Sequence, residues 1–363
     1  MCYRISSVAA LLLVANVATA ADEAPLYPDK ANLLIVFRGE GRKHPVLTAE
    51  DWATKRQHII ANMEKVMGPF PQFDRGAPPK FEIVEETEFP KYVRRKLVYE
   101  AHEGNRVPAY LLIPRGRKEG ERLPAVLCPH PTQRQLGKGV VVGLGGKSDR
   151  HYAMHLVERG YVAFAPDYVA MGEYEYDPLA NGFAGGTMLG IWNHVRAVDL
   201  LQSLPEVDGE RIGAAGHSLG GHNAMFVAVF DQRIRCVVSN CGFDNFPKYY
   251  KGNLSGWAQD LYMPRIRTEY DLDPAKVPFD FPEVVAALAP RAFLASAPLH
   301  DHNFDVTGVR DCIRAAEPVY RLLGAEEKLK ANYPDCAHDF PDDARKVAYE
   351  WLDRWLKPAG AAR

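Results

Sequence analysis

The sequence predicts an α/β protein built on a doubly wound, mostly parallel sheet. From Leu123 onward, short apolar strands alternate with helical patterns, the order that a parallel sheet with helices on both faces produces. A run of the form Gly-x-Ser-x-Gly at Gly216–Gly220 lies between one such strand and the next helix. A chain of 363 residues can also bury a sizeable core. We predict one main domain with an N-terminal extension and a cap insertion.

The first residues have the pattern of a secretory signal peptide. Arg4 precedes the apolar stretch Ile5–Ala15, which is too short to span a bilayer, and Ala18–Ala20 supplies small residues for cleavage. We therefore expect residues 1–20 to be removed and the mature chain to begin near Ala21. The predicted location is secreted or periplasmic, with no membrane attachment after cleavage.

Charge and cysteine content exclude several classes of protein. The formal net charge is −2 with no long run of one sign, so we predict no nucleic-acid partner. Six cysteines, of which Cys2 lies in the leader, leave an odd number, which argues against a disulfide framework. At most two bridges can form, and their pairing and the oligomeric state stay open. Cys336 is expected to pack or to form a bridge rather than to act as a catalytic thiol.

The N-terminal extension, residues 21–80, is expected to carry one amphipathic helix. Thr48 is a candidate N-cap, acidic residues follow it, and an apolar stripe continues to Met67. A Pro/Gly-rich wrapping loop then covers 68–79. Residues 81–357 are predicted to form the main domain. This domain begins with an antiparallel meander, with strands expected at 81–86, 93–100 and 107–113.

The main domain contains the predicted parallel strands and the helices between them. The strands are expected at 125–128, 162–165, 212–215, 236–239, 292–295 and 328–333. The helices are expected at 149–159, 189–203, 219–229, 309–323 and 343–356. One long irregular insertion at 244–282 follows the strand after the Gly-x-Ser-x-Gly strand, where a lid or substrate-binding cap would lie.

Ser218 is the predicted nucleophile. The strand before it and the helix after it form the context of a nucleophile elbow, a strained turn that exposes the serine hydroxyl above a parallel sheet. The helix N-terminus also offers N–H groups to a developing oxyanion. The alternative is a Gly-rich strand-to-helix turn of another α/β fold.

A serine hydroxyl needs a general base, and the base needs an orienting carboxylate. His338 follows the last strand and precedes the terminal helix, where such a base lies; a surface loop histidine is the alternative. Asp301 stands closest to the end of the preceding strand and is favoured as the acid over Asp305, which would need the loop to fold back. The carboxylate that is not used is expected to be an ordinary loop residue or to cap the helix near Val309.

His300 and His302 flank the acid, and with His338 they raise the question of a metal site. Their spacing does not follow a metal-ligand pattern such as His-Glu-x-x-His, and loop histidines beside an acid are commonly hydrogen-bond partners. We therefore predict no metal and no cofactor.

The oxyanion hole is expected to use the backbone N–H of Leu219, the residue after the nucleophile. Its second donor should come from the loop after the first parallel strand, which contains His130-Pro131-Thr132-Gln133. Proline has no N–H, so Pro131 cannot donate, and Thr132 or Gln133 must supply the donor. Gln133 alternatively contacts substrate, and Pro131 alternatively only makes the loop rigid.

These motifs together resemble the α/β-hydrolase superfamily, and within it the dienelactone-hydrolase and acetyl-xylan-esterase-like branch of secreted bacterial hydrolases. The resemblance rests on the runs Gly216–Gly221, Gly190–Asp199 and Ala289–Arg291, and it extends over Leu123–Lys357. It implies a Ser-His-Asp esterase mechanism. Dienelactone hydrolases have cysteine at the position of Ser218, so their substrate is not implied for this chain.

Aromatic residues in the insertion and before it form the candidate substrate-binding surface. Aromatic faces rimmed by polar groups stack on sugar rings or hold an aromatic ester, although roughly half are expected to pack the cap instead. The candidates for substrate contact are His130, Trp257 and Tyr174.

The predicted function is a secreted serine carboxylic-ester hydrolase that deacylates a carbohydrate or another small acyl ester. Its partner is thus a small-molecule or oligosaccharide ester. Two alternatives stay open. A serine peptidase related to prolyl oligopeptidase shares this catalytic domain but usually adds a β-propeller, for which the region before Leu123 is too short. The other alternative is a catalytically silent, carbohydrate-binding hydrolase fold.

Overall fold

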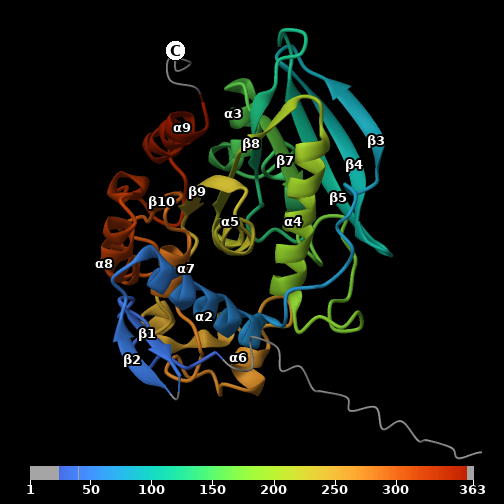
Figure 1. Ribbon diagram of the computed structural model, residues 1–363. Coiled ribbons are helices and arrows are strands. Elements are labelled where there is room, and N and C mark those ends of the chain that lie inside the picture. The colour runs from blue at the N-terminus through green and yellow to red at the C-terminus, as the bar shows by residue number, and fades with distance from the viewer. Residues whose placement is uncertain (1–23, 40, 358–363) are drawn as a thin grey trace, which may run out of the picture.

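The computed structural model describes residues 24–39 and 41–357 (Figure 1). Its core is one nine-stranded sheet with the strand order β11-β10-β9-β8-β6-β7-β5-β4-β3. Helices cover both faces of this sheet, so the predicted doubly wound α/β architecture is confirmed. The predicted signal peptide, residues 1–20, lies outside the described residues. No helix within the described ranges is long and apolar enough to cross a bilayer.

All six strands predicted after Leu123 form, and neighbouring strands in this block are parallel. They are β6 (Leu123–Leu127), β7 (Val162–Pro166), β8 (Val207–His217), β9 (Ile234–Asn240), β10 (Ala292–Ser296) and β11 (Leu329–Asn332). The predicted antiparallel meander also forms, and its last strand pairs with β7, so the meander continues the same sheet. Its strands are β3 (Phe81–Glu88), β4 (Tyr92–His102) and β5 (Asn105–Pro114).

Side chains of the central strands alternate between two separate cores. On β7, Phe164 belongs to one core, whereas Ala163 and Ala165 belong to the other. Helices α4 and α5 lie in front of the sheet in Figure 1 and, with α8, pack on the first core, whereas α3 and α9 pack on the second. The bounds of these predicted helices are α3 (Tyr152–Glu158), α4 (Gly186–Ser203), α5 (Leu219–Phe230), α8 (Val306–Leu322) and α9 (Asp342–Leu356).

The predicted helix of the extension is α2 (Ala49–Met67), and it ends at Gly68 as expected. Thr48 caps it: the Thr48 Oγ1 atom accepts a hydrogen bond from the Asp51 N–H, and the Asp51 carboxylate accepts one from the Thr48 N–H. The helix packs against α6 and α7 at the bottom of Figure 1. The extension is therefore attached to the main domain through α2.

A buried ion pair joins α2 to α7 (Phe281–Ala287). The Lys55 Nζ atom lies 3.1 Å from Glu283 Oε1, and both side chains are fully buried. The same ammonium lies 2.9 Å from the centre of the Tyr27 ring. Glu283 also accepts a hydrogen bond from the backbone N–H of Asp280, the N-cap of α7. One charged pair thus links the extension to the capped end of a core helix.

Several short elements were not predicted. β1 (Ile35–Arg38) and β2 (Arg42–Pro45) form a separate two-stranded sheet. Within the insertion, α6 (Arg265–Thr268) and the start of α7 are helical, and the rest is loops and 3₁₀ turns, as expected for an irregular cap. Elements of four to seven residues are too short to show a hydrophobic period in the sequence.

We expect Lys55→Met to lower the free energy of unfolding by about 3 kcal/mol, because it leaves the Glu283 carboxylate buried without its cation. Chemical denaturation followed by circular dichroism measures the change. The double variant Lys55→Met/Glu283→Gln should cost less than the sum of the two single variants, because no unpaired charge is left buried. Single substitutions with no measurable cost would show that the ion pair does not stabilise the attachment of α2.

Candidate active site

Ser218 lies at the sharp turn between β8 and α5. Its backbone has φ 56° and ψ −121°, a conformation that a residue with a side chain rarely adopts. The two glycines of the Gly-x-Ser-x-Gly run are required by space: a Cβ at Gly216 would collide with the backbone of Gly220, and a Cβ at Gly220 would collide with the Pro129 carbonyl. The Ser218 N–H donates to the Asn240 carbonyl at 2.9 Å, which ties the turn to the neighbouring strand.

A chain of hydrogen bonds connects Ser218 to His338 and Asp301. The His338 Nε2 atom lies 2.9 Å from Ser218 Oγ, and its Nδ1 atom lies 2.9 Å from each Asp301 carboxylate oxygen. A carboxylate can only accept, so Nδ1 carries the proton and Nε2 is left to accept the serine hydroxyl proton. We call these three side chains the relay. They come from the loops after β8, β10 and β11, which all end at one edge of the sheet.

The environment of Asp301 favours its ionised form. Burial would raise the pKa of this carboxyl group, but the hydrogen bond and charge of His338 outweigh burial and lower it. The backbone N–H groups of Asn303 and Phe304 also donate to the carboxylate. Asp301 is therefore held in place from two sides, as a carboxylate that orients His338 must be.

Asp305, the alternative acid, has a different place. It is the N-cap of α8 and accepts hydrogen bonds from the N–H and the hydroxyl of Thr307, both at 2.7 Å. The structure therefore brings Asp301, and not Asp305, to His338. Capping the next helix is one of the two roles expected for the carboxylate that is not used.

The loop that carries His338 is fixed by polar contacts. The Asn240 side-chain amide donates to the carbonyl of Asp339 at 3.0 Å and to the ring of His217 at 2.7 Å. Arg150 donates to the His338 carbonyl at 3.3 Å. Burial lowers the pKa of His217 well below its usual value, and the nearby His338 adds to this effect, so the His217 ring is neutral.

Possible metal ligands near the relay are already engaged. Within the described part of the chain, ligand atoms of Cys241, Asp301 and His338 form the single group that gathers within 4.8 Å. Because Asp301 and His338 bond to each other, we assign them to the relay. His300 instead pairs with the exposed Asp335 at 2.7 Å, and the His302 ring packs edge-on against His338.

A pocket of about 180 Å³ opens beside Ser218 and Leu219. Leu219 is the first residue of α5, so its N–H has no acceptor within the helix and is available to an oxyanion. Thr132 lines the same pocket. Gln133 is not among the lining residues, and its backbone carbonyl accepts a hydrogen bond from the Gly137 N–H. Of the two candidates for the second donor, Thr132 is thus the one that lies at the pocket.

Of the three candidates for substrate contact, Trp257 lines the pocket at Ser218, whereas His130 and Tyr174 do not. Trp257 lines the pocket from the cap. His130 is buried, its Nδ1 atom bonds the Pro131 carbonyl and its Nε2 atom accepts the Tyr168 N–H, so both ring nitrogens are used by the backbone. His130 joins two loops and is not among the residues that line the pocket, so this site lends no support to its predicted contact with substrate.

Tyr174 is likewise part of the core and does not line the pocket at Ser218. Its side chain is buried, and its hydroxyl donates to Asn105 Oδ1 at 2.6 Å and accepts from Asn193 Nδ2 at 3.0 Å. The sequence shows an aromatic residue after a strand but does not show which buried partners satisfy its hydroxyl.

His222 is a pocket residue that sequence reasoning missed. It lies one helical turn after Ser218 and lines the pocket, with its ring 4.7 Å from that of Trp257. Burial lowers the pKa of His222 to about 3, so the ring is neutral, and Nδ1 bonds the Gly242 carbonyl at 3.2 Å. The available signal was its position in the first turn of the helix that follows Ser218, because residues of that turn lie close to the nucleophile turn. Gln259, Tyr262 and Asn303 complete the polar part of the wall.

The cysteines of the described residues are all free thiols. Cys128, Cys236, Cys241 and Cys312 are buried, and Cys336 is partly buried. The bridges that the sequence left open therefore do not form among them, and Cys336 does not form one.

Comparison with known proteins gives sequence relatives. Residues 194–277 match the family model described as BAAT / Acyl-CoA thioester hydrolase C terminal. YtaP of Bacillus subtilis (strain 168), which is named as a hydrolase, is 26% identical over 271 residues, or 72% of this chain and 87% of that one. Dipeptidyl-peptidase 5 of Porphyromonas gingivalis is 24% identical over 278 residues, or 70% of this chain but 37% of that one.

Solved structures share the fold. A glucuronoyl esterase from Solibacter usitatus has a TM-score of 0.70 at 19% identity and covers 92% of this chain and 99% of its own. Acetyl xylan esterase 1 from Thermoanaerobacterium sp. JW/SL YS485 has a TM-score of 0.55 at 18% identity, with 82% and 98% covered. With the sequence relatives, these likenesses confirm the predicted α/β-hydrolase fold, the resemblance to its esterase branch and the expectation of a hydrolytic enzyme.

We expect Tyr174→Phe to lower the free energy of unfolding by about 1–3 kcal/mol, because it leaves Asn105 and Asn193 buried without their shared partner. The KM for a small ester should not change, since Tyr174 does not line the pocket. Tyr270→Phe, which removes a partly exposed hydroxyl that does not line the pocket, is the control for stability. If the Tyr174→Phe variant keeps its stability but has a raised KM for the ester, Tyr174 is a substrate-binding residue.

Proposed function

We propose that this protein is a secreted serine carboxylic-ester hydrolase that acts on esters of carbohydrates. The observation that carries the proposal is the relay, with Ser218 Oγ, both His338 ring nitrogens and the Asp301 carboxylate joined by hydrogen bonds of 2.9 Å at the mouth of a pocket. The proposal assigns the role of nucleophile to Ser218, of general base to His338 and of orienting acid to Asp301.

The proposed mechanism follows from the direction of the hydrogen bonds. Ser218 Oγ attacks the ester carbonyl carbon while His338 Nε2 takes the hydroxyl proton. Asp301 stabilises the imidazolium that forms, and the Leu219 N–H, with a donor from the Thr132 side, stabilises the oxyanion. His338 then gives the proton to the leaving alcohol. Water repeats the sequence on the acyl-enzyme, which releases the acid and restores Ser218.

The pocket wall supports a carbohydrate ester as substrate. Trp257 offers an aromatic surface, and Gln259 and Asn303 offer amides to hydroxyl groups. His222 adds a neutral ring, so the wall described here carries no fixed charge. The two structural neighbours named above are a glucuronoyl esterase and an acetyl xylan esterase, and their names favour the same substrate class.

The predicted leader agrees with this substrate, because polysaccharide esters lie outside the cell. Residues 1–20 carry the signal-peptide pattern and the mature chain would begin near Ala21. We also propose that residues 21–80 act as an extension that supports the catalytic domain at 81–357. The contact of α2 with α7 supports this role of the extension.

A first test replaces the nucleophile. Ser218→Ala should lower kcat for 4-nitrophenyl acetate by about 10⁶-fold, because no other group can attack once the hydroxyl is gone. The matched control is Ser255→Ala, an exposed serine of the cap, which should keep activity within about twofold. Full activity of Ser218→Ala would overturn the mechanism. Faster cleavage of aminoacyl 4-nitroanilides than of acetylated, methylated or feruloylated sugars would make the protein a peptidase instead.

A second test separates the two candidate acids. Asp301→Asn should lower kcat by about 10⁴-fold, because an amide beside Nδ1 favours the wrong imidazole tautomer. Asp305→Asn should leave kcat nearly unchanged, since asparagine caps a helix as well as aspartate does. Steady-state kinetics on the same ester gives both values. The reverse order of effects would assign the acid to Asp305.

A further inference from the structure

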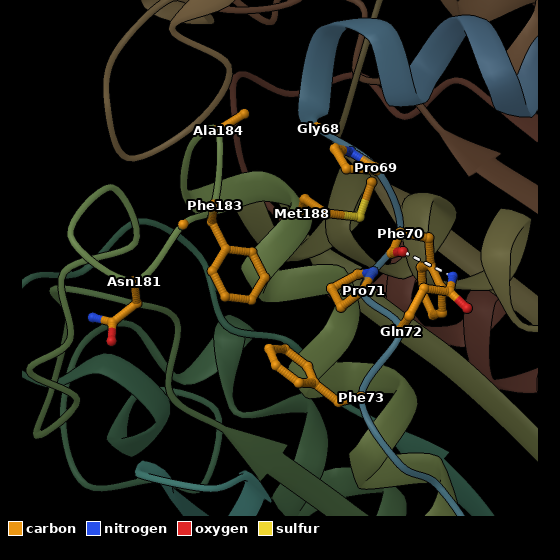
Figure 2. Close-up of a pocket in the computed structure, with 11 residues that line it drawn as sticks. Gly68, Pro69, Phe70, Pro71, Gln72, Phe73, Asn181, Phe183, Ala184 and Met188 are labelled. Carbon is orange, nitrogen blue, oxygen red and sulfur yellow. Dashed lines mark hydrogen bonds between the residues drawn. The ribbon is translucent and has the colours of Figure 1, made fainter. Parts of the chain in front are cut away.

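We propose that a second cavity, separate from the pocket at Ser218, binds a small uncharged aromatic molecule. The cavity has a volume of about 360 Å³. It lies between the start of the wrapping loop, 68–73, and the segment 181–184, with Met188 of α4 at its base. Figure 2 shows Phe183, Phe73, Pro71 and Met188 arranged around one open space. The proposal does not depend on the proposed function.

The wall of this cavity has no charged side chain. Its 68–73 side is formed by Phe70, Phe73 and two prolines, which have no N–H to offer. Phe183 and Met188 form the other side. The polar side chains of the wall are the neutral amides of Gln72 and Asn181. An ionised ligand would lose hydration here without gaining an oppositely charged partner, so the wall selects an uncharged ligand. Met188 adds a flexible, polarisable thioether that packs well against rings.

The aromatic walls are held in position before any ligand binds. The Phe73 ring stacks on His102 at a centroid distance of 4.1 Å with 8° between the planes. The Phe70 ring stacks on Phe230 at 5.6 Å. Both phenylalanines also meet the edge of the buried Trp192, at 5.4 and 5.7 Å. The ring faces are therefore already in place, so binding a ligand would not cost the entropy of ordering these side chains.

The backbone around the cavity is fixed as well. The Glu64 carboxylate of α2 accepts the Phe70 N–H at 3.1 Å, and the Glu64 carbonyl accepts the Gly68 N–H at 2.8 Å. On the other side, the Phe183 N–H donates to the Pro178 carbonyl at 2.9 Å. Each wall is therefore held by hydrogen bonds to the chain segment next to it. The cavity between the two walls exists without a ligand.

The size and exposure of the site point to an aromatic ligand. Phe73 keeps 42% of its surface in water, although it is part of a rigid ring cluster. Its ring and that of Phe183 are tilted by 43° at 6.4 Å, which offers one face and one edge to a third ring. A volume of about 360 Å³ is in the range of pockets that hold small molecules.

This cavity and the pocket at Ser218 share no lining residue. The cap segment between them is bonded to the start of α4: the Gly186 N–H donates to the Asp260 carbonyl and the Thr187 N–H to the Tyr262 carbonyl, each at 3.1 Å. Tyr262 lines the pocket at Ser218. A ligand in the aromatic cavity is therefore a neighbour of the cap and not a substrate of the relay.

The test is a titration of the full chain with N-phenyl-1-naphthylamine, a neutral aromatic probe whose fluorescence rises in apolar surroundings. Phe73→Asp should weaken probe binding by about tenfold or more, because it places a charge on the apolar wall. Phe73→Ala should weaken it in the same direction by removing the ring. Phe73 is partly exposed, so both substitutions should be tolerated, and circular dichroism confirms that each variant is folded.

Matched controls locate the probe. Leu179→Asp changes an exposed apolar residue close by in sequence that does not line the cavity, and it should change the Kd by no more than about twofold. Chain inactivated by a phosphonate at Ser218 should bind the probe equally well. The sulfonated analogue 8-anilinonaphthalene-1-sulfonate should bind at least about tenfold more weakly. Unchanged binding in folded Phe73→Asp, loss of binding on phosphonylation, or equal binding of the anionic analogue would each overturn the proposal.

Discussion

The strained turn at Ser218 is the constraint on which the rest of the structure depends. A φ of 56° at a serine persists only where the surroundings hold it, and here β8 enters the turn, α5 leaves it and Asn240 on the next strand accepts the serine N–H. The close approach of Gly220 to the Pro129 carbonyl brings the loop after β6 against the same turn. Ser218, His338 and the loop of the predicted oxyanion hole therefore meet at one edge of a parallel sheet.

The electrostatic setting of the relay follows from burial. In the proposed mechanism His338 becomes a positive imidazolium for a moment, and a second cation close to it would oppose that state. Burial keeps His217 and His222 neutral, so the two nearest histidines of β8 and α5 add no charge. Asp301 is the negative charge that is hydrogen-bonded to the His338 ring, and its ionised form is stabilised by that ring and by backbone N–H groups.

The proposed extension and cap are both bonded to helices of the central sheet layer. α2 carries Lys55 into a buried pair with α7, and the Arg56 guanidinium donates to the carbonyls of Ala287 and Val229 at the ends of α7 and α5. The cap is tied to α4 by the two backbone hydrogen bonds at Gly186 and Thr187. The wall that faces Ser218 is thus carried by elements that are themselves packed on the sheet, which is what a preorganised site requires.

The sequence alone determined the order of the long helices and of the sheet strands from β3 onward, because apolar periodicity and the glycines of the Ser218 turn act locally. It also placed His338 on the loop after the last strand and favoured Asp301 over Asp305 by distance from a strand end. Only the tertiary structure decided which polar and aromatic side chains face the pocket. His130 and Tyr174 are buried against partners far away in the chain, whereas His222 and Asn303 reach the pocket wall. Burial is a property of packed neighbours, and no local pattern records it.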